Sequence, residues 1–268
     1  MPKQISEEEK ILYQHEIKAS QDKIEEIKKK EEQLLLLIKD KPEEGPLTGL
    51  VLAEEMLNLA ECYFEIGAAS KTLLNSKNEE ILNEGRKTIY KCLIYLENVV
   101  TNFIDAPFSE YEEKLSKISS FDAAQRYNLA EKTGKTIDLL KSAYGDNTKW
   151  KWSFVDIDGR FATVAKNLLD LKKAVSNTDP RSPDYEPTVY HLEMIKKLLN
   201  HAASRYREKY EASTSAEDFQ NAISYLRALF RIHTLMGDKD ESAAIKKKYE
   251  IWTAKLKTDI KSKKVHGH

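Results

Sequence analysis

The chain has 268 residues, with 43 basic and 44 acidic side chains and a formal net charge of −1. Because the two signs nearly cancel, no long-range field draws the protein onto nucleic-acid phosphates, and we expect no nucleic-acid partner. Charged residues make up 32% of the chain and only 9 Gly and 7 Pro interrupt it, a balance typical of long helices.

The hydropathy of the chain predicts no membrane span, because no segment approaches the run of about 18 apolar residues that a spanning helix needs. The first ten residues are acidic and lack the apolar core and small-residue cleavage site of a secretion signal. We therefore expect a cytoplasmic protein. A periplasmic or secreted protein is the alternative if an export signal has been removed from the chain.

Residues 1–44 are predicted to form one long N-terminal amphipathic helix. Ser6 and Glu9 make a capping-box pattern, and the apolar residues that follow recur at intervals of seven, three and four: Ile17, Ile24, Ile27, Leu34 and Ile38. This narrow stripe predicts a helix that packs along other helices or self-associates as a coiled coil through residues 6–40. The Pro and Gly residues at 41–49 are expected to end it.

Residues 45–176 are predicted to form a first helical-hairpin region. Apolar and small side chains keep helical spacing from about residue 50 to 74 and again from about 79 to 104. The connection is short, so we expect these two helices to be antiparallel neighbours. Cys62 and Cys92 are expected to be buried free thiols on them, with one disulfide as the alternative in an oxidising compartment.

Two more helices are predicted in the same region. Ser109 and Glu112 make a second capping-box pattern, which opens a helix that ends at Gly145. An aromatic patch follows and leads into a helix that fades at Ser176. The patch consists of Trp150, Trp152, Phe154 and Phe161.

Residues 177–187 are expected to form the one long loop, because three prolines there remove backbone donors and favour an extended path. Residues 188–257 are predicted to form a second helical-hairpin region of three helices, with turns near Ser215 and Gly237. A basic tail that is poor in apolar residues, 258–268, is expected to be flexible.

The predicted fold is all-α, with about eight long helices in antiparallel hairpins arranged as an α-solenoid or an irregular bundle. The segment 225–252 resembles a tetratricopeptide helix-turn-helix through Leu226, Leu229, Gly237, Ala243, Ala244 and Tyr249. The segment 57–67 does so more loosely, through Ala60 and Tyr63. The regular period of about 34 residues is absent. The resemblance implies stacked hairpins that bind other proteins in a concave groove.

Cations interleaved with aromatic residues form the candidate partner-binding segment: Lys149, Trp150, Lys151, Trp152 and Phe154. Such combinations suit hot spots for acidic or aromatic partners. The alternative is that the two tryptophans pack at the junction between hairpins. The loop that carries Tyr185 is a second candidate for partner binding, and a plain connector is its alternative.

The motifs that would indicate catalysis or metal binding are incomplete. Gly134, Lys135 and Thr136 match the end of a phosphate-binding loop, but Leu129 stands where that motif needs its first Gly, and no strand precedes it. The six histidines form no HExxH or comparable zinc pattern. We therefore expect no catalytic residue, no metal and no cofactor.

These observations predict a non-enzymatic scaffold or adaptor that binds other proteins through a groove between helical hairpins. The first alternative is a structural subunit of a larger assembly, such as a bacterial motility or secretion apparatus. The second alternative is an enzyme whose carboxylates converge in a pocket between helices.

Overall fold

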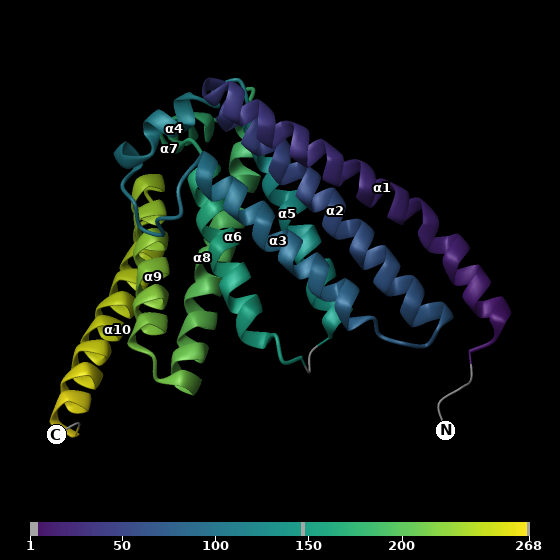
Figure 1. Ribbon diagram of the computed structural model, residues 1–268. Coiled ribbons are helices and arrows are strands. Elements are labelled where there is room, and N and C mark those ends of the chain that lie inside the picture. Colours follow the sequence, from purple (N-terminus) through teal and green to yellow (C-terminus); the bar gives the residue numbers. More distant parts are fainter. Residues whose placement is uncertain (1–4, 146–147, 267–268) are drawn as a thin grey trace. The chain divides into compact units, whose positions relative to one another are not determined.

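The computed structural model describes residues 5–145 and 148–266. Within these ranges the protein has ten α-helices, two short 3-10 helices and no strand (Figure 1). The all-α prediction is confirmed, with two more helices than the approximately eight expected. None of the described helices is both long enough and apolar enough to cross a membrane.

The described residues fall into two compact units, and none of the boundaries between them lies in the loop at 177–187. The first unit draws on Met1–Val99 and Asn128–Lys149, and the second on Val100–Tyr127 and Trp150–His268. The loop lies inside the second unit because the helices before it and after it pack on each other.

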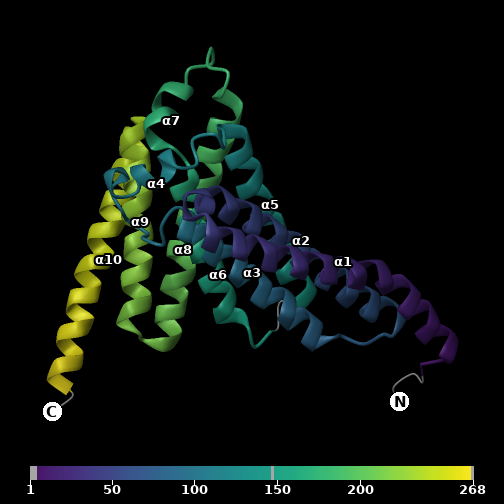
Figure 2. The ribbon, with the colours of Figure 1, turned by 45° about the horizontal axis from the view of Figure 1, so that its top comes forward.

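The first unit contains α1 (Glu7–Asp40), α2 (Gly45–Leu73) and α3 (Glu79–Val99). Helices α1 and α2 run side by side in both views (Figure 1, Figure 2). They are antiparallel, as are α2 and α3. The predicted hairpin of α2 and α3 is therefore confirmed, and Cys62 and Cys92 are buried free thiols on these two helices.

The apolar stripe of α1 packs within its own unit. Its buried side chains are Ile17, Ser20, Ile24, Ile27 and Glu31. Ser20 Oγ donates to Glu65 Oε2 of α2 at 2.7 Å, and the Glu31 carboxylate accepts from Lys91 Nζ at 2.6 Å and from Tyr95 of α3 at 2.5 Å. The two polar positions in the stripe are thus satisfied inside the unit. The stripe from Ile17 to Glu31 is thus covered within the unit, whereas Leu34 and Ile38 are half-buried. Self-association through residues 6–40 stays a prediction.

The expected helix break at 41–49 is shorter than predicted. A 3-10 turn covers Pro42–Glu44, and α2 begins at Gly45. Pro46 is tolerated because the first helical turn does not use its missing N–H group. A Cβ at Gly49 would lie 2.6 Å from Val99 Cγ2, so this glycine allows α2 and α3 to approach closely.

The single helix predicted from Ser109 to Gly145 is wrong. The chain forms a 3-10 turn at Phe108–Glu110, a short helix α4 (Glu112–Ser116), and then α5 (Ala123–Tyr144). Asp122 causes the restart: its Oδ1 accepts the Gln125 N–H at 2.8 Å, and Gln125 Oε1 accepts the Asp122 N–H at 2.9 Å. This reciprocal pair is a capping box.

The second unit contains the last five helices: α6 (Lys151–Leu168), α7 (Leu171–Asn177), α8 (Tyr185–Ser213), α9 (Ala216–Met236) and α10 (Lys239–His266). Helix α6 packs on α8, α8 on α9 and α9 on α10, each pair antiparallel. Both views show α8, α9 and α10 side by side (Figure 1, Figure 2). The predicted second hairpin region, residues 188–257, thus corresponds to most of α8, all of α9 and most of α10.

Two boundaries in this unit differ from those predicted. Helix α8 begins at Tyr185 rather than at residue 188, because Pro187 falls in its first turn, where proline is tolerated. Helix α10 continues through the predicted tail to His266. Residues 267–268 of that tail, and residues 1–4 of the predicted N-terminal region, lie outside the described residues.

Candidate functional site

An open groove of about 660 Å³ lies between the first half of α1 and the second half of α2. Helix α1 contributes Leu12, Glu16, Ile17, Ala19 and Ser20. Helix α2 contributes Glu65, Ala68, Ala69, Thr72 and Leu73. The volume of the groove falls within the roughly 300–1,000 Å³ of typical ligand pockets. Both of its walls are helices, and the groove is open to solvent.

The side chains of α2 that line the groove lie on one face of the helix. One face of α2 contacts α5: Lys132 Nζ donates to Asn58 Oδ1 at 2.8 Å, and Thr136 Oγ1 donates to Glu61 Oε1 at 3.1 Å. Four, seven and eleven residues after Glu61, the same face continues as the groove wall with Glu65, Ala68 and Thr72.

Small and apolar side chains line much of this groove. The three alanines leave room for side chains of a partner, since a methyl group fills little of the space between two helix backbones. Leu12, on the α1 side, is 51% exposed, and its neighbour Ile11 is 68% exposed. Exposed large apolar residues beside a groove are typical of a binding surface.

The charge of the groove is acidic, because Glu16 and Glu65 are the charged side chains among the residues that line it. Glu65 accepts a hydrogen bond from Ser20 at 2.7 Å, which orients its carboxylate at the groove. Glu16 is exposed and has no ion-pair partner in the described part of the chain. A cation on a partner would therefore meet two carboxylates there.

A protein-family model, that of the TP0443 family, matches residues 9–260, from the first turn of α1 into α10. The chain belongs to the TP0443 family. No curated protein and no solved structure matches the chain. The match spans both units of this TP0443-family protein and includes all ten groove residues. The tetratricopeptide resemblance of 57–67 and 225–252 stays a prediction.

The predicted partner-binding segment of this TP0443-family protein lies around the start of α6. Trp150 is the residue before the helix and is half-buried, Trp152 is half-buried, and Phe154 is buried. Lys149 and Lys151 are exposed. The Lys151 amino group lies 4.8 Å from the centroid of the Trp152 ring. Much of the aromatic surface is thus engaged in packing, and partner binding by this segment stays a prediction.

Tyr185, the other predicted site residue, is not brought to this segment. It begins α8, which runs antiparallel to α6. His191 Nε2 lies 2.9 Å from the carbonyl oxygen of Ala165, and the Tyr206 hydroxyl donates to Asp156 at 3.3 Å. The start of α8 therefore meets the end of α6, at the opposite end from Trp150.

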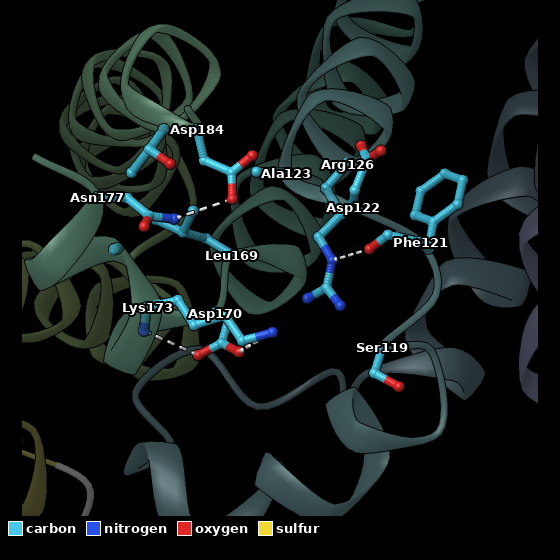
Figure 3. A pocket seen from close by; sticks show the side chains of 12 residues that line it. Ser119, Phe121, Asp122, Ala123, Arg126, Leu169, Asp170, Lys173, Asn177 and Asp184 are labelled. Carbon is cyan, nitrogen blue, oxygen red and sulfur yellow. Dashed lines mark hydrogen bonds and ion pairs between the residues drawn. The ribbon is translucent and has the colours of Figure 1, made fainter. Parts of the chain in front are cut away.

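A smaller cavity of about 110 Å³ in the second unit is lined by three carboxylates (Figure 3). Asp122, Asp170 and Asp184 precede α5, α7 and α8, respectively. Asp170 accepts the N–H groups of Lys172 and Lys173, both at 3.2 Å. Asp122 caps α5 in the same way, so two of the three carboxylates are bound to helix N-termini.

Arg126 closes one side of this cavity as a structural clasp. Its side chain donates to three carbonyl oxygens: Ile118 at 2.9 Å, Phe121 at 2.7 Å and Leu168 at 3.0 Å. Burial lowers the pKa of this guanidinium. The cavity is also smaller than the roughly 300 Å³ of small ligand pockets. Its groups act as a joint between helices, so the α1–α2 groove is the stronger candidate site.

The structure also shows where the incomplete phosphate-loop motif lies. Residues 134–136 lie in the middle of α5, where the Thr136 hydroxyl donates to Lys132 O at 2.9 Å. A continuous helix cannot wrap its N–H groups around a phosphate. In the described residues, no three His, Cys, Asp or Glu side chains gather as metal ligands would.

The groove was missed by the sequence prediction because only Ile17 and Ser20 of its α1 residues belong to the apolar stripe, and the others lie beside it. Leu12 and Ala19 stand outside the repeat formed by Ile17, Ile24 and Ile27. The adjacent pair Ala68 and Ala69 was the available signal, since small residues on a helix surface permit close approach by another helix.

Proposed function

We propose that this protein is a non-enzymatic scaffold or adaptor that binds an amphipathic helix of another protein in the α1–α2 groove. The observation that supports this function is the groove itself, about 660 Å³ between two antiparallel helices. Binding of an amphipathic helix in such a groove is a recurrent mode of peptide recognition.

The chemistry of the groove defines the partner. Its helix carries an apolar stripe that packs on Leu12, Ala69 and Leu73, and Lys or Arg residues beside the stripe that pair with Glu16 and Glu65. Apolar burial supplies most of the affinity, at roughly 1.5–3 kcal/mol for each large side chain. The ion pairs add less affinity and act mainly on partner choice and association rate.

Site-specific photo-crosslinking tests this proposal in the cells that make the protein. A photoreactive amino acid replaces Ala68, which is exposed in the groove, and the crosslinked segment of any partner is identified by mass spectrometry. We expect a crosslink to a helical segment with an apolar stripe bordered by Lys or Arg. The matched control places the same amino acid at Ile94, which is 45% exposed on α3.

The charge of the groove provides the second arm of this experiment. In the Glu16→Lys/Glu65→Lys double variant, the crosslink from position 68 should fall at least tenfold while the helix content stays unchanged. Crosslinks that survive this reversal, that occur equally from position 94, or that map to acidic or non-helical segments would contradict the proposal.

A further inference from the structure

The outer face of α10 is a second surface that the second unit leaves uncovered. The inner face packs on α9: Trp252 is 5% exposed, and its ring lies 5.8 Å from the ring of Phe219. On the outer face, Ile251 is 57% exposed, and Ala254 beside it is also exposed. A large apolar side chain therefore projects from a helix surface that is otherwise small or charged.

Lysines border this apolar projection. Lys247 and Lys255 lie four residues before and four residues after Ile251, so the three side chains share one stripe of α10. Both lysines are exposed, and Lys255 also pairs with Asp259 of the same helix at 2.9 Å. Residues 246–261 contain six lysines and two acidic residues, so this part of the helix is strongly basic.

The α10 face and the α1–α2 groove are complementary in charge. The groove offers a space lined by alanines and bordered by Glu16 and Glu65. The α10 face offers one isoleucine bordered by two lysines. The outer face of α10 thus supplies an exposed apolar side chain together with the basic residues that the acidic groove favours.

We infer that α10 of a second copy of this chain occupies the α1–α2 groove. This inference rests on the proposed function and names the partner of the same groove. Because the groove and α10 are different surfaces of one chain, the contact is head-to-tail. In a pair of copies, the copy whose groove is filled keeps a free α10, and the other copy keeps a free groove. Further copies can therefore add in a row. The protein is a self-assembling structural subunit.

Mass measurement is the first test. Light scattering on the full chain from about 1 µM to about 1 mM, the range over which weak interfaces dissociate, should give a mass that rises with concentration. The rise should be smaller at high salt, because the lysine and glutamate pairs are exposed and screened. A monomer mass over the whole range would overturn the inference.

A complementation experiment tests the head-to-tail geometry. Ile251→Asp removes the apolar projection and leaves the groove intact, whereas Ala68→Trp fills the groove and leaves α10 intact. Both positions are exposed, so both variants should fold, which circular dichroism checks. Each variant alone should be monomeric, and an equimolar mixture should form a dimer that grows no further. Ile94→Asp, at an exposed site on α3, is the control and should assemble like the original chain.

The outcomes separate this inference from the proposed function. A mixture that stays monomeric while the original chain assembles would overturn the inference, because the contact would then lie elsewhere. In the crosslinking experiment, a crosslink from position 68 to residues 247–255 of a second copy would support both. A crosslink to a basic helix of a different protein would support the proposed function and overturn the inference.

Discussion

Lys166 places a primary amine in the interior of the second unit. Its side chain is 3% exposed, and its Nζ lies 5.2 Å from the centroid of the Tyr111 ring. Burial lowers the pKa of this amine to about 8, although the nearby carboxylate of Asp105 raises it. Burial removes the hydration of the charged amine, and no close carboxylate among the described residues compensates for this cost. The charged form of Lys166 therefore destabilises the folded protein.

The pH dependence of stability follows from this pKa. The unfolded chain holds the proton up to a pKa of 10.5, whereas the folded protein releases it near 8, so the unfolded state binds more protons between these values. Stability therefore rises with pH in this window. Relative to Lys166→Met, the free energy of unfolding of the original chain should increase by about 1 kcal/mol from pH 7 to pH 9.

Urea denaturation of both proteins at the two pH values measures this difference. Taking the difference also removes the contribution of the other titrating groups, which the two proteins share. The same substitution at Lys197, an exposed lysine of α8, is the control and should show no such change. A difference between the original chain and Lys166→Met that is constant with pH would show that Lys166 stays charged or solvated.

At the scale of single elements, glycines set how closely α2 and α3 approach. A Cβ at Gly85 would lie 2.4 Å from the Phe64 ring, closer than any real contact. Gly85→Ala gains up to about 1 kcal/mol of helix propensity but forces the ring to move, which typically costs about 1–3 kcal/mol. We expect a net loss of about 1–2 kcal/mol in the free energy of unfolding.

A matched pair of variants checks the cause. At Gly45 a Cβ would lie 3.6 Å from Ile38, an ordinary contact, so Gly45→Ala should be neutral or stabilising. Adding Phe64→Leu to Gly85→Ala should recover part of the loss. Equal effects of Gly45→Ala and Gly85→Ala in thermal unfolding would mean that the close contact with Phe64 does not determine stability.

The turn between α4 and α5 depends on Arg126. This side chain is 5% exposed and satisfies three carbonyl oxygens, so Arg126→Met leaves polar groups buried without partners. The expected loss is roughly 2–5 kcal/mol. Hydrogen exchange should also accelerate in residues 117–122. The matched control, Arg181→Met before α8, removes an exposed ion pair with Asp179 and should cost under about 1 kcal/mol. Similar losses in the free energy of unfolding for both variants would contradict a structural role of the Arg126 hydrogen bonds.

At the scale of the whole molecule, the two units are built on the same plan of sequential antiparallel helices, and the family match extends over both. In the first unit, α1 is part of the core, because Ile17, Ile24 and Ile27 are 4%, 6% and 4% exposed. The first helix is therefore expected to contribute to the stability of its unit as well as to the groove.

Removal of residues 1–44 tests this integration. The deletion exposes the face of α2 that α1 covers, and each lost isoleucine contributes roughly 1.5–3 kcal/mol of burial. Thermal unfolding should show a large loss of stability in the first unit. A truncated chain that unfolds at the original temperature would show that α1 is an independent arm.

The sequence by itself determined the all-α class, the α2–α3 and α8–α9–α10 hairpins, and core positions such as Leu96 and Leu229, which are 1% and 2% exposed. These follow from local periodicity and caps, which are properties of short segments. The restart at Asp122 was within reach as well, since Asp122 and Gln125 form a capping box that the prediction overlooked.

Only the tertiary structure decided three other features. The stripe of α1 suits a coiled coil or an intramolecular partner equally, and only the structure shows that Ser20 contacts α2 and Glu31 contacts α3. From the sequence, Gly49 is predicted to end a helix. In the structure it lies inside α2, where it allows Val99 of α3 to approach closely. The groove depends on how α1 lies along α2, with Ser20 of α1 against Glu65 of α2. All three depend on which helix lies against which, and that depends on side chains far apart in the chain.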